Sequence, residues 1–262
     1  MTLDIQEANN NAVEHLLMGQ PRDAIATLLH ALDSLKTDLI CQLSLAGAGN
    51  ANLTTSFSSS SAQMEVDGSA VHLYSVDLCH DFDIEEPAFP VRWYGKPIAI
   101  TCDGEWGEED CQSGPMNHDL NLVVVLYNLA ISYQLVDAAP KNQDSNLVRR
   151  RMASTNAFEA YTLALQALVP IQERMHLSGR LMAPSERFDF GLLHAAVVNN
   201  MLFLYAQRAD MQGMSTCLSI LRQVLAFSCR GLPPCDAEEF AFFRVNAILY
   251  PNPGSLSLSP AA

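Results

Sequence analysis

The sequence predicts a mainly α-helical domain, an antiparallel stack of repeated helical hairpins with a small β-hairpin and loop insert. Three observations predict this fold. The spacing N-x4-Y occurs at Asn128 and at Asn200, with a weaker copy at Asn10. Small and apolar residues recur seven positions apart downstream of each copy. Residues that typically end or start helices lie between the two patterns.

Each unit is expected to contain a helix, a break and a second, antiparallel helix. Seven residues are two helical turns, so residues at that spacing share one helix face, and small ones let a neighbouring helix approach closely. The seven-residue pairs, each followed by an apolar residue, are Ala24 with Ala31, Ala157 with Ala164, and Cys217 with Val224. The sequence therefore predicts three hairpin units.

Glycine and proline mark the breaks between the paired helices. Gly19 followed by Pro21 has the order typical of a helix C-terminus and a new first helical position, which predicts a compact turn in the first unit. A longer break is expected over 140–146, and Gly213 is expected to separate the helices of the third unit. Only the first unit has the short spacing of a compact turn.

These elements predict one helical domain over 1–250. Its units cover about 3–40, 118–169 and 185–228, followed by a terminal helix over 236–250, with an insert over 41–117 and a tail over 251–262 that we expect to be disordered. In the terminal helix, Asp236 is a candidate N-cap, and Glu239 follows it at capping-box spacing. We expect this helix to cover the apolar end of the stack.

The insert divides into a polar linker and a candidate β-hairpin. Small and hydroxyl-bearing residues dominate 45–61, which predicts a mobile linker because they bury too little apolar area to offset the entropy of ordering. Alternation from Val71 to Ser75 and the stretch KPIAIT at 96–101 predict two short strands. A two-stranded hairpin is marginal alone, so we expect it to pack on the helices.

Composition limits the partners and the compartment. The 262 residues include 29 acidic and 15 basic side chains, a formal charge of −14, which repels nucleic acid and anionic membranes. The longest apolar run, 122–136, is interrupted by polar residues and is shorter than the about 20 residues of a membrane span, so no span is predicted. An acidic N-terminus without signal-peptide features, and seven scattered cysteines that fit reduced thiols, predict a cytoplasmic protein.

Motifs for catalysis and cofactor binding are weak throughout the sequence. GxSxG, GxxxxGK[ST] and GxGxxG are all missing, so we expect neither an enzyme nor a cofactor. The stretch of the chain richest in cysteine and histidine, the usual metal ligands, contains Cys79, His80, Cys102, Cys111 and His118. It has no CxxC pair. A metal-dependent enzyme or regulator with a site in 62–118, including Asp103, remains the alternative function.

The first unit resembles the tetratricopeptide repeat. The positions that carry the resemblance are Ala12, Gly19, Ala24 and Ala31, then Asn128, Leu129, Ala130, Tyr133, Ala157 and Ala164, then Asn200 and Tyr205. The order of these segments along nearly the whole chain is also similar to tetratricopeptide-like proteins of diatoms to which no activity is assigned. The repeat and the lack of a catalytic motif predict a non-catalytic scaffold or adaptor that binds a protein or peptide segment in the concave groove of the stack. Self-association is a further alternative, because open helical stacks with apolar ends often dimerise.

The resemblance also implies site residues. The helix positions that line the concave groove in such repeats correspond here to Asn9, Val13, Tyr127, Ile131, Gln134, Asn199 and Phe203. These mostly uncharged residues suit an apolar or amphipathic helix or an extended segment. The repeat asparagines Asn10, Asn128 and Asn200 could hold a peptide main chain, but packing between helices is the more common role. Tyr133 and Tyr205 are expected to wedge between helices.

Overall fold

The computed structural model describes residues 5–48, 71–78, 91–102, 115–138, 147–177, 184–229 and 234–249. Within these residues the chain forms seven helices and two strands. In chain order they are α1 (Ile5–Leu17), α2 (Pro21–Ala48), β1 (Val71–Ser75), β2 (Ile98–Cys102), α3 (Pro115–Ala138), α4 (Leu147–Leu177), α5 (Pro184–Gln207), α6 (Met211–Ser228) and α7 (Pro234–Leu249). The fold is mainly helical with a small sheet, as predicted.

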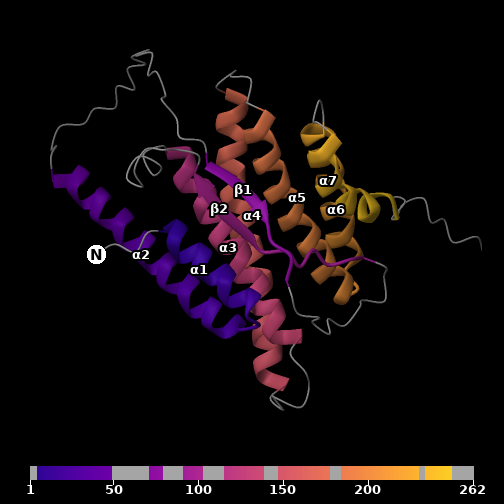
Figure 1. Ribbon diagram of the computed structural model, residues 1–262, viewed down its shortest axis with the longest axis horizontal. Helices are drawn as coiled ribbons and strands as arrows, with labels where there is room; N and C mark the ends of the chain where they lie inside the picture. The colour runs from indigo at the N-terminus through magenta and orange to yellow at the C-terminus, as the bar shows by residue number, and fades with distance from the viewer. Residues whose placement is uncertain are drawn as a thin grey trace, which may run out of the picture.

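The helices follow one another across the molecule, from α1 and α2 at one side to α6 and α7 at the other (Figure 1). Each helix packs on the next along the chain, and α1, α3, α5 and α7 also contact one another in that order. The two strands lie against α1, α3 and α5. Four helices therefore form a continuous surface, and the sheet lies on it.

Two turns between paired helices have the same hydrogen bonds. In the first, Gly19 has a φ of 69°, its N–H donates to the carbonyl of Leu16, and the next N–H donates to the carbonyl of His15. In the second, Ala209 has a φ of 53°, and the corresponding bonds run to Ala206 and Tyr205. Both turns are Schellman motifs, so the compact turn predicted for the first unit is confirmed, and a second one exists between α5 and α6.

The predicted break at Gly213 is wrong, because this glycine lies inside α6. The helix starts after Asp210, whose side chain accepts a hydrogen bond from the Gly213 N–H. A Cβ at Gly213 would lie 2.3 Å from the ring of Tyr205, so glycine lets this ring pack against α6. Tyr205 also meets Phe158 of α4 edge-on, at 5.2 Å between ring centroids. This tyrosine therefore packs between helices, as expected.

The predicted β-hairpin is confirmed. β1 and β2 pair antiparallel, with Leu73 opposite Ile100 and Ser75 opposite Ile98. α2 extends to Ala48, so 45–48 of the predicted linker is helical. The rest of that linker, most of the insert and the 251–262 tail lie outside the described residues.

The terminal helix α7 begins two residues earlier than predicted. Pro234 occupies its start, where a missing N–H has no cost, so the prediction of Asp236 as N-cap is wrong. Glu239 does not complete a capping box either. Its carboxylate accepts hydrogen bonds from the Ser75 and Tyr94 hydroxyls instead. α7 packs on α5 and α6, the position expected of a helix that covers the end of the domain.

Within the part of the chain that the structure describes, two helices are long and apolar enough to cross a membrane by length and composition, which the sequence-based prediction did not anticipate. They cover Asp119–Ala138 and Arg187–Gln207, with mean hydropathies of 1.4 and 1.2. Of these windows, 72% and 89% are buried inside the protein. Burial of this kind is typical of core helices, so the absence of a membrane span stays a prediction.

A buried histidine on α5 makes stability depend on pH. His194 is only 6% exposed, and its burial lowers the pKa from 6.5 to about 4. Between those pH values the unfolded chain binds a proton that the folded chain does not, so stability is intact above pH 6.5 and falls as the pH drops toward 4. Urea unfolding should show that the wild type loses about 2 kcal/mol more than His194→Leu between pH 7.5 and 5. Equal losses would contradict the assignment.

Candidate functional site

An extended segment of the chain, 91–102, lies along the surface formed by α1, α3, α5 and α7. Four asparagines, which we call the asparagine ladder, hold its main chain. Each accepts the N–H of one residue at Oδ1 and donates Nδ2 to the carbonyl of the same residue, at 2.7–3.1 Å. The pairs are Asn246 with Arg92, Asn200 with Tyr94, Asn128 with Ile98, and Asn10 with Ile100.

The geometry of an extended chain explains why the ladder contacts alternate residues. Successive peptide groups point to opposite edges of a strand, so only every second residue faces the helices. A step of two residues spans roughly 7 Å, and a step of four residues spans roughly 13 Å. The roughly 8–10 Å spacing of packed helices lies between these two lengths. The four-residue step passes over Lys96. There the hydroxyl of Tyr127 donates to the Lys96 carbonyl at 3.0 Å.

The opposite edge of the segment faces β1. The N–H of Val76 donates to the carbonyl of Pro97, and Ala99 and Thr101 lie opposite Tyr74 and His72 in the sheet. Between 97 and 101, odd-numbered residues thus face β1 and even-numbered residues face the ladder. The side chains of Val91, Tyr94, Ile98 and Ile100 are buried. This part of the segment is enclosed on both edges.

The same arrangement of three asparagines occurs twice. In each triad, one asparagine holds residue n, a second donates to the carbonyl of residue n, and a third holds residue n+2. The first donates to the second at 2.6 or 2.8 Å, and the second donates to the third at 3.3 or 3.4 Å. The triads are Asn246, Asn199 and Asn200 around Arg92 and Tyr94, and Asn128, Asn9 and Asn10 around Ile98 and Ile100. They contact the segment six residues apart.

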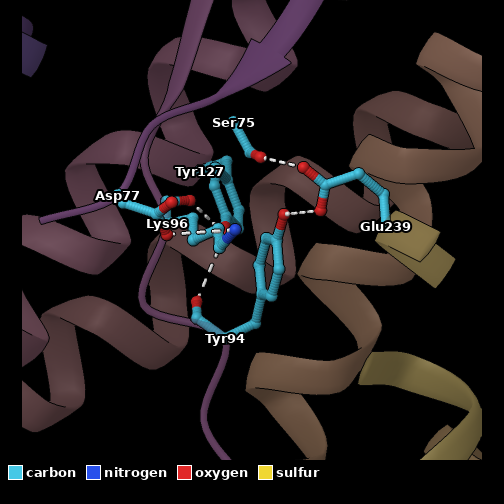
Figure 2. Close-up of polar contacts among 6 residues, drawn as sticks. All are labelled: Ser75, Asp77, Tyr94, Lys96, Tyr127 and Glu239. Atoms are coloured by element: carbon cyan, nitrogen blue, oxygen red, sulfur yellow. Dashed lines mark hydrogen bonds and ion pairs between the residues drawn. The ribbon is translucent and has the colours of Figure 1, made fainter. Parts of the chain in front are cut away.

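Tyr94 is the main aromatic anchor of the segment. Its ring packs 4.6 Å from that of Phe243 on α7, and its hydroxyl faces the carboxylate of Glu239, which also accepts from Ser75 Oγ at 2.5 Å (Figure 2). Burial, together with the nearby Glu239 charge, raises the pKa of Tyr94 above its ordinary value, so the phenol stays protonated. Tyr94 therefore ties the segment, β1 and α7 together.

A second polar cluster holds Trp93. Its indole N–H donates to Gln134 Oε1 at 2.9 Å, and the hydroxyl of Tyr161 donates to the same oxygen. Asn200 donates in turn to the Tyr161 hydroxyl at 2.9 Å. A Cβ at Gly95 would lie 2.5 Å from the Trp93 ring, so glycine lets the indole fold back over the chain. The helices therefore form hydrogen bonds with both the main chain and the side chains of the segment.

The structure places the seven predicted groove residues in two groups. Asn9, Tyr127, Gln134 and Asn199 form hydrogen bonds with the segment. Val13, Ile131 and Phe203 are buried side chains of the same helices. Whether any of them binds a separate partner stays a prediction.

The sequence favoured packing between helices as the role of the repeat asparagines, and this expectation is wrong. Asn10, Asn128 and Asn200 all hold main chain instead of serving only as packing groups between helices. The packing role exists as well, because Asn128 donates to Asn9 from α3 to α1. Two contributors were missed. Asn246 precedes Tyr250 by four residues instead of five, and Glu239 had been interpreted as a capping residue.

The metal alternative gains no support from the described side chains. Among them, no group of three or more His, Cys, Asp or Glu could hold a metal ion. The candidates Cys79, His80, Asp103 and Cys111 lie outside the described residues, as do the side chains of Cys102 and His118. Cys217 and Cys229 are free thiols, as expected.

The chain matches no protein-family model, no curated protein and no solved structure. Its function is therefore inferred from the geometry of the ladder.

Proposed function

We propose that this chain is a cytoplasmic, tetratricopeptide-like scaffold that binds an extended segment of a partner protein along α1, α3, α5 and α7, without chemistry of its own. The observation that carries the proposal is the paired contact of four buried or half-buried asparagine amides with alternate main-chain groups of 91–102. Such contacts recognise a backbone in extended conformation and depend little on side-chain identity.

Internal repetition supports the repeat-stack part of this proposal. The asparagine triad occurs twice, and the Schellman turn occurs in two units. The alanines that carry the tetratricopeptide resemblance are all fully buried, which allows close helix packing: Ala12, Ala24, Ala31, Ala130, Ala157 and Ala164. On this reading α7 is the first helix of a fourth unit, because Asn246 acts as Asn10, Asn128 and Asn200 do.

The segment 91–102 is the resident occupant of the proposed site, so a partner must displace it. A tethered segment competes at an effective concentration on the order of 1 mM. A free peptide that makes the same contacts should therefore half-displace it only near that concentration. Substitutions that weaken the internal segment lower the required peptide concentration. Each loss of about 1.4 kcal/mol in the binding free energy of that segment lowers it tenfold.

The test adds a synthetic peptide of sequence VRWYGKPIAIT, residues 91–101, to full-length protein. Tyr94→Ala/Ile98→Ala removes two buried anchors of the internal segment and leaves every asparagine of the ladder in place. Removing a buried side chain of this size costs about 2–5 kcal/mol. Fluorescence anisotropy of the labelled peptide should show half-saturation at least 100-fold lower for the variant than for the wild type.

The single variant Ile98→Ala is a second arm, in case the double variant is not helical by circular dichroism. The peptide should also raise the melting temperature of each variant, because it binds the folded chain only. If a helical variant fails to bind at millimolar peptide, the segment is a permanent part of the core and the proposed function is wrong. Equal binding to variant and wild type would place the peptide elsewhere.

A further inference from the structure

The internal segment is a template for the ligand, and this inference rests on the proposed function. We infer that the partner is an extended stretch of nine residues whose main chain is held at positions n, n+2, n+6 and n+8. It carries an aromatic residue, best a tyrosine, at n+2 and branched aliphatic residues at n+6 and n+8. In the resident segment these positions are Arg92, Tyr94, Ile98 and Ile100.

Main-chain readout requires a free N–H at each of the four positions. The N–H of Tyr94 donates to Asn200 and that of Ile98 donates to Asn128, both at 2.9 Å and both buried. A proline or an N-methyl group there removes the donor. At Ile98 this takes the N–H partner from the buried Asn128 Oδ1. At Tyr94 it leaves Asn200 Oδ1 with the longer bond from Asn199 Nδ2 at 3.3 Å. Proline is accepted between these positions, since Pro97 at n+5 faces β1 and contributes only its carbonyl.

Burial of the resident side chains shows which positions select side chains. Tyr94 is 2% exposed, and Ile98 and Ile100 are fully buried, so these positions select large apolar groups. Arg92 at n is exposed, although its main chain is held on both atoms. Position n therefore takes any residue with an N–H.

The hydroxyl partner at n+2 favours tyrosine over other aromatic residues. Glu239 offers a carboxylate oxygen 3.4 Å from the phenol, beside the ring of Phe243. A phenylalanine at n+2 would fill the same space, but it has no hydroxyl. The Glu239 carboxylate would then accept a hydrogen bond from Ser75 and lose the one from the phenol. We expect that change to weaken binding by a few fold, and the effect should shrink in Glu239→Gln.

The experiment measures the binding of modified VRWYGKPIAIT peptides, each changed at one position. The protein is Ile98→Ala or the Tyr94→Ala/Ile98→Ala double variant, in which the resident segment is weakened. N-methylation at the Tyr94 or Ile98 position should weaken binding at least 10-fold. Sarcosine at the neighbouring Gly95 position, which adds the same methyl group, should change it less than 3-fold. Serine at the Tyr94 position should weaken binding at least 10-fold, whereas serine at the Arg92 position should not.

The outcomes separate this inference from the proposed function. If the parent peptide binds but methylation at 94, 95 and 98 has equal effects, the alternating main-chain readout is wrong and the scaffold proposal stands. If serine at 92 is as damaging as serine at 94, the assignment of selective positions is wrong. If the parent peptide does not bind at all, the proposed function fails first.

Discussion

Replacing Asn128 with aspartate should lower the free energy of unfolding by about 4 kcal/mol at pH 7.5. Asn128 is fully buried, and its Nδ2 donates to the Ile98 carbonyl at 2.7 Å and to Asn9 Oδ1 at 2.8 Å. The substitution keeps the shape of the side chain but puts a charged acceptor opposite two acceptors. The carboxylate would keep the Ile98 N–H as a donor, but a buried charge without an opposite charge beside it is strongly destabilising.

The same change should make stability depend on pH in a defined direction. Burial and the two facing oxygens raise the pKa of the new carboxyl in the folded state above its ordinary value of about 3.9. The unfolded chain then releases its proton at lower pH than the folded chain does. The destabilisation is therefore small near pH 4 and grows as the pH rises. Urea unfolding should show a loss about 3 kcal/mol smaller at pH 5 than at pH 7.5.

Asn10→Asp is the matched control, because Asn10 makes the same paired contact with Ile100 but is half-exposed. Water can solvate a carboxylate there, so the loss should stay below about 1.5 kcal/mol at pH 7.5. Similar losses at both positions, or a loss at Asn128 that is the same at pH 5 and pH 7.5, would show that the buried Nδ2 donor has no special role.

Local patterns in the sequence predicted the elements of the fold, because their signals lie within a few residues. Gly19 and Pro21 marked the first turn, and alternation near Val71 marked a strand. The turn before α6 was misplaced because Ala209, not a glycine, adopts the positive φ there. The Schellman hydrogen bonds end α5 there, and the Asp210 side chain caps the start of α6. An alanine in the sequence indicates neither feature.

The ladder could be predicted only in part, because its contacts are far apart in the chain. Asn10, Asn128 and Asn200 were recognised from their spacing, but a spacing does not reveal the bonding partner. Arg92 and Asn246 are separated by 154 residues, and Tyr94 and Asn200 by 106. Nothing in the stretch VRWYGKPIAIT by itself indicates that its alternate peptide groups meet four helices. The repeated asparagine is thus a visible signal of a main-chain site, whereas its occupant is visible only in three dimensions.

Replacing Asn200 with leucine should lower the free energy of unfolding by about 3 kcal/mol and open the middle of the segment. Asn200 holds the N–H and the carbonyl of Tyr94 at 2.9 Å each and donates to the Tyr161 hydroxyl. Leucine leaves the two Tyr94 groups buried without these partners, at about 1–3 kcal/mol each, while its own apolar burial offsets part of the loss.

Hydrogen exchange distinguishes loss of this contact from a general loss of stability. In the wild type the Tyr94 amide should exchange slowly, because its N–H is bonded in a buried site. In Asn200→Leu it should exchange at least 100-fold faster, while the Ile100 amide, held by Asn10 at the other end, should change much less. Asn156→Leu, a half-buried asparagine on α4, is the control and should leave both amides unchanged. If the Tyr94 and Ile100 amides accelerate together, the segment opens as one unit, and the two triads do not hold it independently.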